Sequence, residues 1–296
     1  MIGRLSTLQF NQSGVSTILD AQAEVARLQE QIGTGRRIMR PSDDPSGSVQ
    51  LVKLNTELSK IESYQKNIAA VTSALSFEEV ALNSANDVLL RVRELTIQGQ
   101  TGTLAQSDRD AIANEIDILR EQLLSIGNIQ NAEGDYIFAG TASNKPAYDA
   151  NAVFQGDAVV RQANIGEGIR VARGHSGAEV FEAVNGGLNT FDVLAGLSQA
   201  LRNNDQEVVS ARFIDVDEAT EKLSSTRTSI GVRMNWIENQ ASLNDNFNLN
   251  LQRTISDIQD LDIAEAIGRL QLQMVSLQAA QQTFVKTQNL SLFNYL

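Results

Sequence analysis

The chain has 296 residues, of which 42% are hydrophobic and 5% aromatic, and its formal net charge is −12 at pH 7. This length suits roughly two domains, and the acidic balance argues against nucleic acid or an anionic membrane as a partner, because both repel negative charge. The absence of Cys excludes disulfides and thiolate metal sites.

The first residues predict an amphipathic helix without a targeting signal. MIGRLSTLQFNQSG has no apolar core and no small-residue cleavage site, so a Sec signal peptide is not expected. No run approaches the roughly 18 apolar residues of a membrane-spanning helix. The helix is expected to end at Gly33 or Gly35, and its weak apolar stripe contains Val15, Ile18, Val25, Leu28 and Ile32.

Residues 33–48, GTGRRIMRPSDDPSGS, predict a corner in the chain. Pro41 disfavours helix at the residue before it, and Pro45 suits the first position of a new helix with Asp44 as its N-cap. Asp43 adds negative charge beside the positive helix end. The corner leaves three cations, which could pair with Asp43 and Asp44 or with acids on a neighbouring subunit: Arg36, Arg37 and Arg40.

A long helix is predicted from Leu51 to about Gln98. Heptad spacing carries this prediction, through Leu51, Leu54, Leu58, Ile61, Gln65, Ile68, Thr72 and Leu75, and then Leu82, Leu89 and Val92. Such a helix is about 70 Å long, whereas a compact globule of this mass is about 50 Å across. The sequence therefore predicts a rod.

A turn at GQTGTLAQSDRD leads to a second, antiparallel helix. Ser107 is expected to cap it, with Asp110 at the capping-box position. Its apolar stripe contains Ile112, Ile116, Leu119, Leu123 and Ile126.

The middle of the chain, from Asn131 to about Gly187, is rich in Gly and in short β-prone runs. It predicts a small β-domain inserted between helical halves, with strands at residues 136–139, 158–161 and 169–172. Helical patterns return at Phe191 and then run almost unbroken from about Val208 to the end.

The C-terminal helix carries a second heptad stripe, which has no partner nearby in the sequence. It contains Ile263, Ile267, Leu270, Met274, Leu277, Gln281 and Phe284. The two ends of the chain are expected to bury their stripes against each other. The predicted fold is therefore mainly α: an elongated antiparallel helical or coiled-coil rod formed by both chain ends, with a small inserted β-rich domain.

No catalytic, cofactor or metal site is predicted. The only histidine, His175, lies in the Gly-flanked stretch RVARGHSGAE without a nucleophile nearby, which favours an ordinary loop histidine. The acids of FIDVDE are expected on a solvated helix face, with Asp215 and Glu218 on one side. Neither GTGRR nor NIGEGIRVARG has the spacing of a phosphate-binding loop.

Several motifs in order resemble bacterial flagellins. They are GTGRRIMRPSDDP, the long heptad helix, IQGQTGTLAQSDRDAIANEIDILREQLLSIGN and the Gln-rich C-terminal helix. PSDDP, GDYIFAGT at residues 134–141 and LSLFNYL at residues 290–296 are more similar to the flagellin-related hook-associated proteins of the hook-filament junction. A short filament flagellin is the alternative. An enzyme on such a scaffold would need a motif such as H-E-x-x-H, and the chain has one His.

The resemblance implies three domains: residues 1–40 with 256–296 as an inner terminal coiled coil, residues 41–140 with 190–255 as a long-helix shaft, and residues 141–189 as a β-rich outer domain. It implies a non-enzymatic adaptor without cofactors, extracellular in the flagellum and exported by the flagellar type III system without a cleaved signal peptide. The implied partners are other copies in a ring, the hook-side junction protein, flagellin and a cytosolic chaperone on the C-terminal helix, with no nucleic acid and no membrane. The expected assembly residues are Arg36, Arg37, Arg40, Asp43, Asp44, Ile263, Ile267, Leu270, Met274, Leu277, Phe284, Leu292, Phe293 and Leu296.

Overall fold

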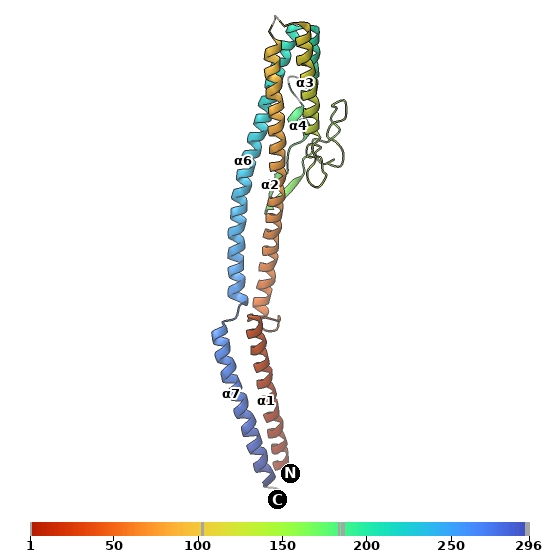
Figure 1. Cartoon of the computed structure of the whole chain (residues 1–296). Coiled ribbons are helices and arrows are strands. Elements are labelled where there is room, and N and C mark those ends of the chain that lie inside the picture. Colours follow the sequence, from red (N-terminus) through yellow and green to blue (C-terminus); the bar gives the residue numbers. More distant parts are fainter. Residues whose placement is uncertain (1, 102–103, 183, 185–186, 294–296) are drawn as a thin grey trace. The chain divides into compact units, whose positions relative to one another are not determined.

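The computed structural model describes residues 2–101, 104–182, 184 and 187–293, with the backbone alone at residues 2–8, 10, 11 and 288–293. In chain order the helices and strands of this part are α1 (Ile2–Thr34), α2 (Pro45–Gly99), α3 (Gln106–Gly127), β1 (Gln162–Gly166), β2 (Ile169–Ala172), α4 (Gly177–Phe181), α5 (Thr190–Asn203), α6 (Gln206–Gln259) and α7 (Ile263–Phe293) (Figure 1). The prediction of a mainly helical chain with a small inserted β element is confirmed.

The chain divides into two compact units. Unit 1 contains residues 1–60 and 247–296, and unit 2 contains residues 61–246. Helices α2 and α6 each contribute to both. The three predicted domains have other boundaries and stay a prediction, while residues 141–189 lie within unit 2.

Unit 1 is built on α1 and α7, which lie side by side and antiparallel (Figure 1). The Phe284 ring lies so close to Gly14 that a Cβ on this glycine would be 2.9 Å from it, while the Leu261 N–H donates to the Gly35 carbonyl at the other end of the pair. The stripes predicted at the two chain ends thus meet. Their buried and half-buried members are Ile18, Val25, Leu28 and Ile32 on α1 and Leu270, Leu277 and Phe284 on α7.

Unit 2 is built on the antiparallel helices α2 and α6. Arg93 pairs with Asp217 at 2.6 Å near one end of this pair, and Gln65 donates to Asp245 near the other. Between these contacts most of the predicted heptad positions of α2 are buried in one core with α6, but the predicted Thr72 is half-buried and its neighbour Val71 is buried instead. The core includes Val71, Leu75, Leu82, Leu89 and Val92 from α2, and Val216, Leu223, Ile230 and Ile237 from α6. The heptad pattern therefore predicted the buried face of α2.

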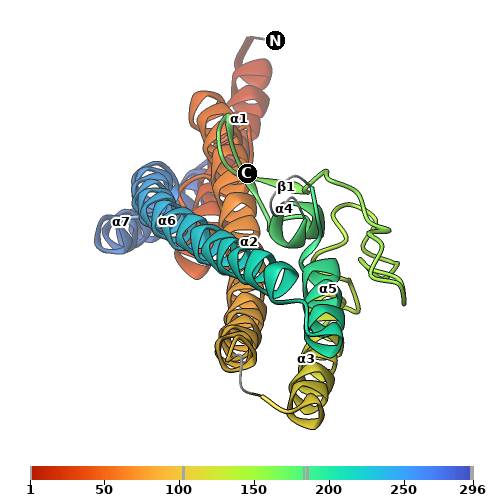
Figure 2. The ribbon, with the colours of Figure 1, turned by 90° about the horizontal axis from the view of Figure 1, so that it is seen from above.

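Helices α3 and α5 form the second helix pair of unit 2 (Figure 2). Arg202 of α5 pairs with Asp117 of α3 at 2.5 Å, and Arg120 Nε of α3 donates to the Phe191 carbonyl. The predicted cap at Ser107 is wrong, because α3 begins at Gln106 and its N-cap is Ala105, two residues earlier, which makes no side-chain cap.

The inserted segment contains less strand than the sequence predicts. Residues 169–172 form β2 as expected, but its partner β1 starts at Gln162, and residues 136–139 and 158–161 form no strand. Asn67 of α2 and Asn244 of α6 donate to the Asn164 and Ile165 carbonyls of β1, which anchors the hairpin on both long helices. Helices supply the hydrogen bonds that a third strand would supply in a larger sheet.

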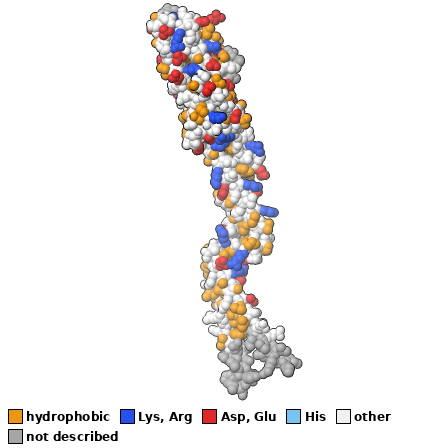
Figure 3. All heavy atoms as spheres, turned by 90° about the vertical axis from the view of Figure 1, so that its right-hand side faces the viewer, with side chains coloured by type: hydrophobic (Ala, Val, Ile, Leu, Met, Phe, Trp, Pro, Cys, Tyr) orange, Lys and Arg blue, Asp and Glu red, His pale blue; other side chains and the backbone are white. Residues whose placement is uncertain are grey.

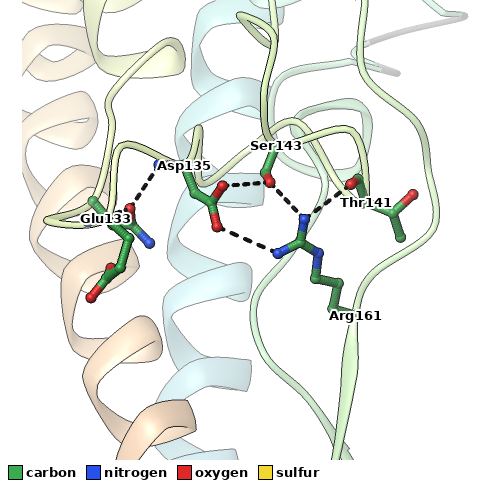
Figure 4. Close-up of polar contacts among 6 residues, drawn as sticks. Glu133, Asp135, Thr141, Ser143 and Arg161 are labelled. Atoms are coloured by element: carbon green, nitrogen blue, oxygen red, sulfur yellow. Dashed lines mark hydrogen bonds and ion pairs between the residues drawn. The ribbon is translucent and has the colours of Figure 1, made fainter.

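Two motifs of the inserted segment contact each other. Gly140 of GDYIFAGT has φ +70°, and a Cβ there would lie 2.2 Å from the Asp157 carbonyl of FQGD, so only glycine fits. The Asp157 carboxylate accepts from the Thr141 N–H at 2.8 Å and from its hydroxyl, and these hydrogen bonds lower the pKa of Asp157. Nearby, Arg161 bridges Asp135, Ser143 and the Thr141 carbonyl (Figure 4).

A cluster of aromatic rings holds the inserted segment to α4 and α5. Tyr148 lies edge-on to Phe191 at 4.8 Å between ring centroids and to Phe181 at 6.0 Å. Phe138 and Phe154 extend the cluster. Burial raises the pKa of the Tyr148 phenol, which therefore stays neutral.

Candidate assembly interface

The predicted corner lies in unit 1, between α1 and α2. Gly35 ends α1 with φ +68°, a conformation that favours glycine. Pro45 is the first residue of α2, and the Asp44 carboxylate accepts from the Gly47 N–H at 2.9 Å. The roles predicted for Gly35, Pro45 and Asp44 are confirmed.

The corner is fastened to the junction between α6 and α7. The Arg37 N–H donates to the Gln259 carbonyl at 2.7 Å, and the Arg37 guanidinium donates to the Ile258 carbonyl at 2.7 Å. Gln31, 5% exposed, donates in turn to the Arg37 carbonyl at 2.7 Å. The α1–α2 connection and the α6–α7 connection, which are more than 200 residues apart in the sequence, are thus joined by hydrogen bonds.

Two of the three corner arginines pair within the chain. Arg37 reaches Asp44 at 3.5 Å and Arg40 reaches Glu30 at 3.5 Å, while Asp43 accepts from the backbone N–H groups of Met39 and Arg40. The Arg36 side chain is exposed and makes no hydrogen bond or ion pair with any described residue. Arg36 is therefore the corner cation that remains available to another molecule.

Asp44→Ala is expected to loosen the start of α2. The Gly47 hydrogen bond, followed by the Ser46 hydroxyl, lowers the pKa of Asp44. The stabilisation that the Asp44 carboxylate gives is thus complete above its pKa in the unfolded chain, about 3.9. It is lost as the pH falls through the lower pKa of Asp44 in the folded chain. Hydrogen exchange of the Gly47 and Ser48 amides should be several-fold faster in the variant at pH 7. This difference should vanish in acid, and equal exchange at pH 7 would mean that Asp44 does not cap the helix.

Helix α7 has an exposed apolar face beside the one that α1 covers. Leu270, Leu277 and Phe284, which face α1 and which we call the seam, are half-buried, as predicted. The other members of the predicted stripe are exposed. Ile263, Ile267 and Met274 are 51%, 42% and 51% exposed, and Val285, eleven residues after Met274, is 57% exposed. We call these four residues the outer stripe of α7. The side chains of Leu292 and Phe293 and the whole of Leu296 lie outside the described residues.

Few apolar side chains are buried in the described part of unit 1. In its described part only Leu28, Ile38, Leu51 and Ala266 are buried apolar residues. Figure 3 shows hydrophobic side chains gathered on the surface next to the grey atoms. Leu272 and Val275 of α7 are 72% and 65% exposed, and Leu19 of α1 is 58% exposed. An apolar surface of this extent is typical of a contact with other chains.

The lone histidine is buried rather than in an open loop. His175 is 4% exposed, with Nδ1 2.7 Å from Glu78 of α2 and Nε2 3.2 Å from the Arg233 guanidinium of α6. Because Arg233 can only donate, Nε2 accepts and the Nδ1 proton faces Glu78. Sequence reasoning missed this contact because its partners are 97 and 58 residues away.

Other candidate polar groups are structural. Asp215, which was predicted to be solvated, is 2% exposed and pairs with Arg212 at 2.8 Å, so that prediction is wrong. Within the part of the chain that the structure describes, no three His, Asp or Glu side chains gather as a metal site. No helix of the described ranges has both the length and the hydropathy that a membrane span requires.

Two protein families match the ends of the chain. Residues 5–143 match the bacterial flagellin N-terminal helical region, and residues 214–296 match the bacterial flagellin C-terminal helical region. The first contains the corner and α2, and the second contains most of α6 and all of α7. The matched segments therefore contain most of the pairs α1 with α7 and α2 with α6, whereas α5 lies outside them.

Relatives and solved structures agree with these matches. The chain is 27% identical to flagellar hook-associated protein 3 of Escherichia coli over 98% of both chains, and 30% identical to flagellin of Bacillus subtilis over 85% of both. It superposes with a TM-score of 0.69 on a Vibrio parahaemolyticus structure described as a flagellar hook-associated protein, at 27% identity, over 74% of this chain and all of that one. The flagellar junction protein FlgL of Legionella pneumophila has the same fold, with a TM-score of 0.59 at 18% identity, over 72% of this chain and all of that one.

Proposed function

This chain belongs to the bacterial flagellin family, and within it to the FlgL-type hook-associated proteins of the hook-filament junction, and from that premise we propose that it is a structural adaptor without catalytic activity. It joins the hook, through the hook-side junction protein, to the flagellin filament. Copies of the chain form a ring, and the protein is located outside the cell, in the flagellum.

The small core of unit 1 carries this proposal. α1 and α7 bury one seam, but the outer stripe, Leu19, Leu272 and Val275 stay exposed. Each large apolar side chain contributes about 1.5–3 kcal/mol when it is fully buried, so contacts between copies can supply the stability that one copy lacks. Arg36 adds a cation at the corner that can pair with an acid of a neighbour.

Export as an unfolded chain through the flagellar type III system fits the same features. The chain has no Cys, so no disulfide could hold it folded. The exposed apolar face of α7 is a suitable site for a cytosolic chaperone before export, because it is free until copies assemble. No cleaved signal peptide is needed on this route.

A short filament flagellin is the second candidate, favoured by the 30% identity to a flagellin. The two candidates differ in what is lost with the gene. In a deletion strain, a junction protein leaves hooks intact and flagellin secreted but unattached, whereas loss of a filament flagellin leaves junction proteins in place and little or no flagellin in the medium. We expect free flagellin and bare hooks, measured by immunoblotting of the medium and electron microscopy of cells. Normal filaments in this strain would contradict the proposal.

A further inference from the structure

Unit 2 has an apolar groove between the hairpin and α6 that no described residue fills. Its walls are residues 170–172 of β2 and Thr228, Ser229, Val232, Arg233 and Trp236 of α6, and this open groove has a volume of about 540 Å³. We call it the hairpin groove. Val232 is 65% exposed and Trp236, the only tryptophan of the chain, is 44% exposed. Exposed tryptophan beside a hollow is typical of the centre of a protein-protein contact.

Hydrogen bonds hold the wall of the groove in place. Arg233 is held by the buried His175 at 3.2 Å and by the Gly174 carbonyl at 3.3 Å. β2 is paired with β1, which Asn67 and Asn244 hold on the long helices. A preformed wall lowers the entropic cost of binding a partner.

The groove also carries positive charge that the chain does not neutralise. Arg170 lies in its wall, and the Arg170 side chain makes no hydrogen bond or ion pair with any described residue. The guanidinium of Arg233 is engaged by His175 and by backbone carbonyls. An occupant of the groove should therefore be acidic at its rim and apolar at its centre.

Acidic charge is concentrated elsewhere on the same chain. Unit 1 has 10 Lys and Arg against 10 Asp and Glu, whereas unit 2 has 14 against 26 and so carries the whole net charge of −12. Within unit 2, residues 81–157 and 177–224 have 8 basic against 20 acidic residues, while the remainder, which contains the groove, is balanced at 6 against 6. This acidic part also has exposed apolar side chains, of which Ile118 of α3 at 65% and Ile214 of α6 at 63% are the most exposed.

We propose that the hairpin groove docks a second copy of this chain through the acidic part of its unit 2, residues 81–157 and 177–224. The inference rests on the proposed function and names a contact by which copies bind one another. The two surfaces differ, so the contact is heterologous, and such contacts build rings when the rotation closes. The apolar centre supplies affinity, and the charges of the rim set orientation and the rate of association.

Cross-linking tests this contact directly, because the native chain has no Cys. A photoreactive group on Val232→Cys of the purified full-length protein should give a cross-linked dimer. Mass spectrometry should place the second attachment within residues 81–157 or 177–224. Attachment elsewhere, or monomer alone up to several hundred micromolar protein, would overturn the proposal. Val232 is exposed, so folding is not at risk, and circular dichroism checks it.

Charge reversal provides a matched pair of variants. Arg170→Glu should lower the yield of that cross-link about tenfold at low salt, and Lys66→Glu, at an exposed lysine of α2 in the same unit, should change it less than twofold. Equal loss in both variants would mean that only net charge matters and would overturn the docking site. If cross-linking fails while the deletion strain still releases unattached flagellin, the groove proposal falls and the adaptor function stands.

Discussion

Met274→Glu should abolish attachment of the filament while the purified monomer keeps its helical content. Met274 belongs to the outer stripe of α7 and is 51% exposed, so a carboxylate is hydrated in the free chain. In the proposed assembly the same carboxylate would be buried against apolar side chains of a neighbour, which costs several kcal/mol without a partner. Complementation of the deletion strain measures the effect, with at least tenfold fewer filaments and flagellin free in the medium.

Ser276→Glu is the matched control for this variant. The substitution adds the same charge to the same helix, but on another face. Ser276 is exposed and lies seven residues from Arg269 and from Thr283, which are also exposed and share its face. It should complement nearly as well as the wild-type gene. Full motility with Met274→Glu would exclude the outer stripe from the assembly interface.

Leu89→Ala should strongly destabilise unit 2. The Leu89 side chain is completely buried in the core between α2 and α6. Its truncation removes buried methyl groups and leaves a cavity, and such changes cost about 2–5 kcal/mol. Urea unfolding followed by the emission of Trp236, which lies in the same unit, measures the loss.

Leu90→Ala provides the comparison at the next position. Leu90 is 43% exposed, so the same chemical change should cost less than about 0.5 kcal/mol. Equal losses in the two variants would mean that the heptad register of α2 is wrong. The two variants therefore test the heptad register of α2 in the monomer, without reference to assembly.

Local chemistry in the sequence predicted most of the helices. α2 begins at Pro45 after Asp44, as its capping residues require, and it ends at Gly99. α1 ends at Thr34, beside Gly35. These limits depend on a few neighbouring residues, and the buried face depends on a periodicity that Leu75, Leu82 and Leu89 repeat clearly.

One helix break was missed although the sequence contains its signal. The pattern was expected to run almost unbroken from Val208 to the end, but it breaks at residues 260–262. Asp262 accepts from the Glu265 N–H at 3.0 Å, and D-x-x-E is the spacing of a capping box. The break also depends on Gly35 and Arg37, which bind Leu261 and Gln259 from across the chain.

Features set by distant contacts could not be predicted. The strand expected at residues 158–161 is displaced to β1 because Asn67 and Asn244 bind the carbonyls of residues 164 and 165. Asp215 was expected to be solvated because it alternates with other acids, but Arg212 pairs with it in a buried site. Sequence periodicity gives a face of a helix and leaves open which side chains the rest of the fold covers.

The candidate site was predicted in part for the same reason. Arg36, Arg37 and Arg40 were expected as one cluster, and the structure separates Arg36 from the two that pair within the chain. The C-terminal stripe was expected to be buried as one face, and the structure divides it into a seam and an outer stripe. The face of α1 that packs against α7 is too narrow to cover both the seam and the outer stripe of α7.

The contact between Gly14 and Phe284 sets an order of events in folding. These two residues are 270 positions apart, so closing this contact in an unfolded chain carries the entropy of a very long loop. Residues 61–246 contain a complete core and can fold first, which removes most of that loop. Unit 1 is then the last part to fold, because α1 cannot pack against α7 until α7 (Ile263–Phe293) has formed.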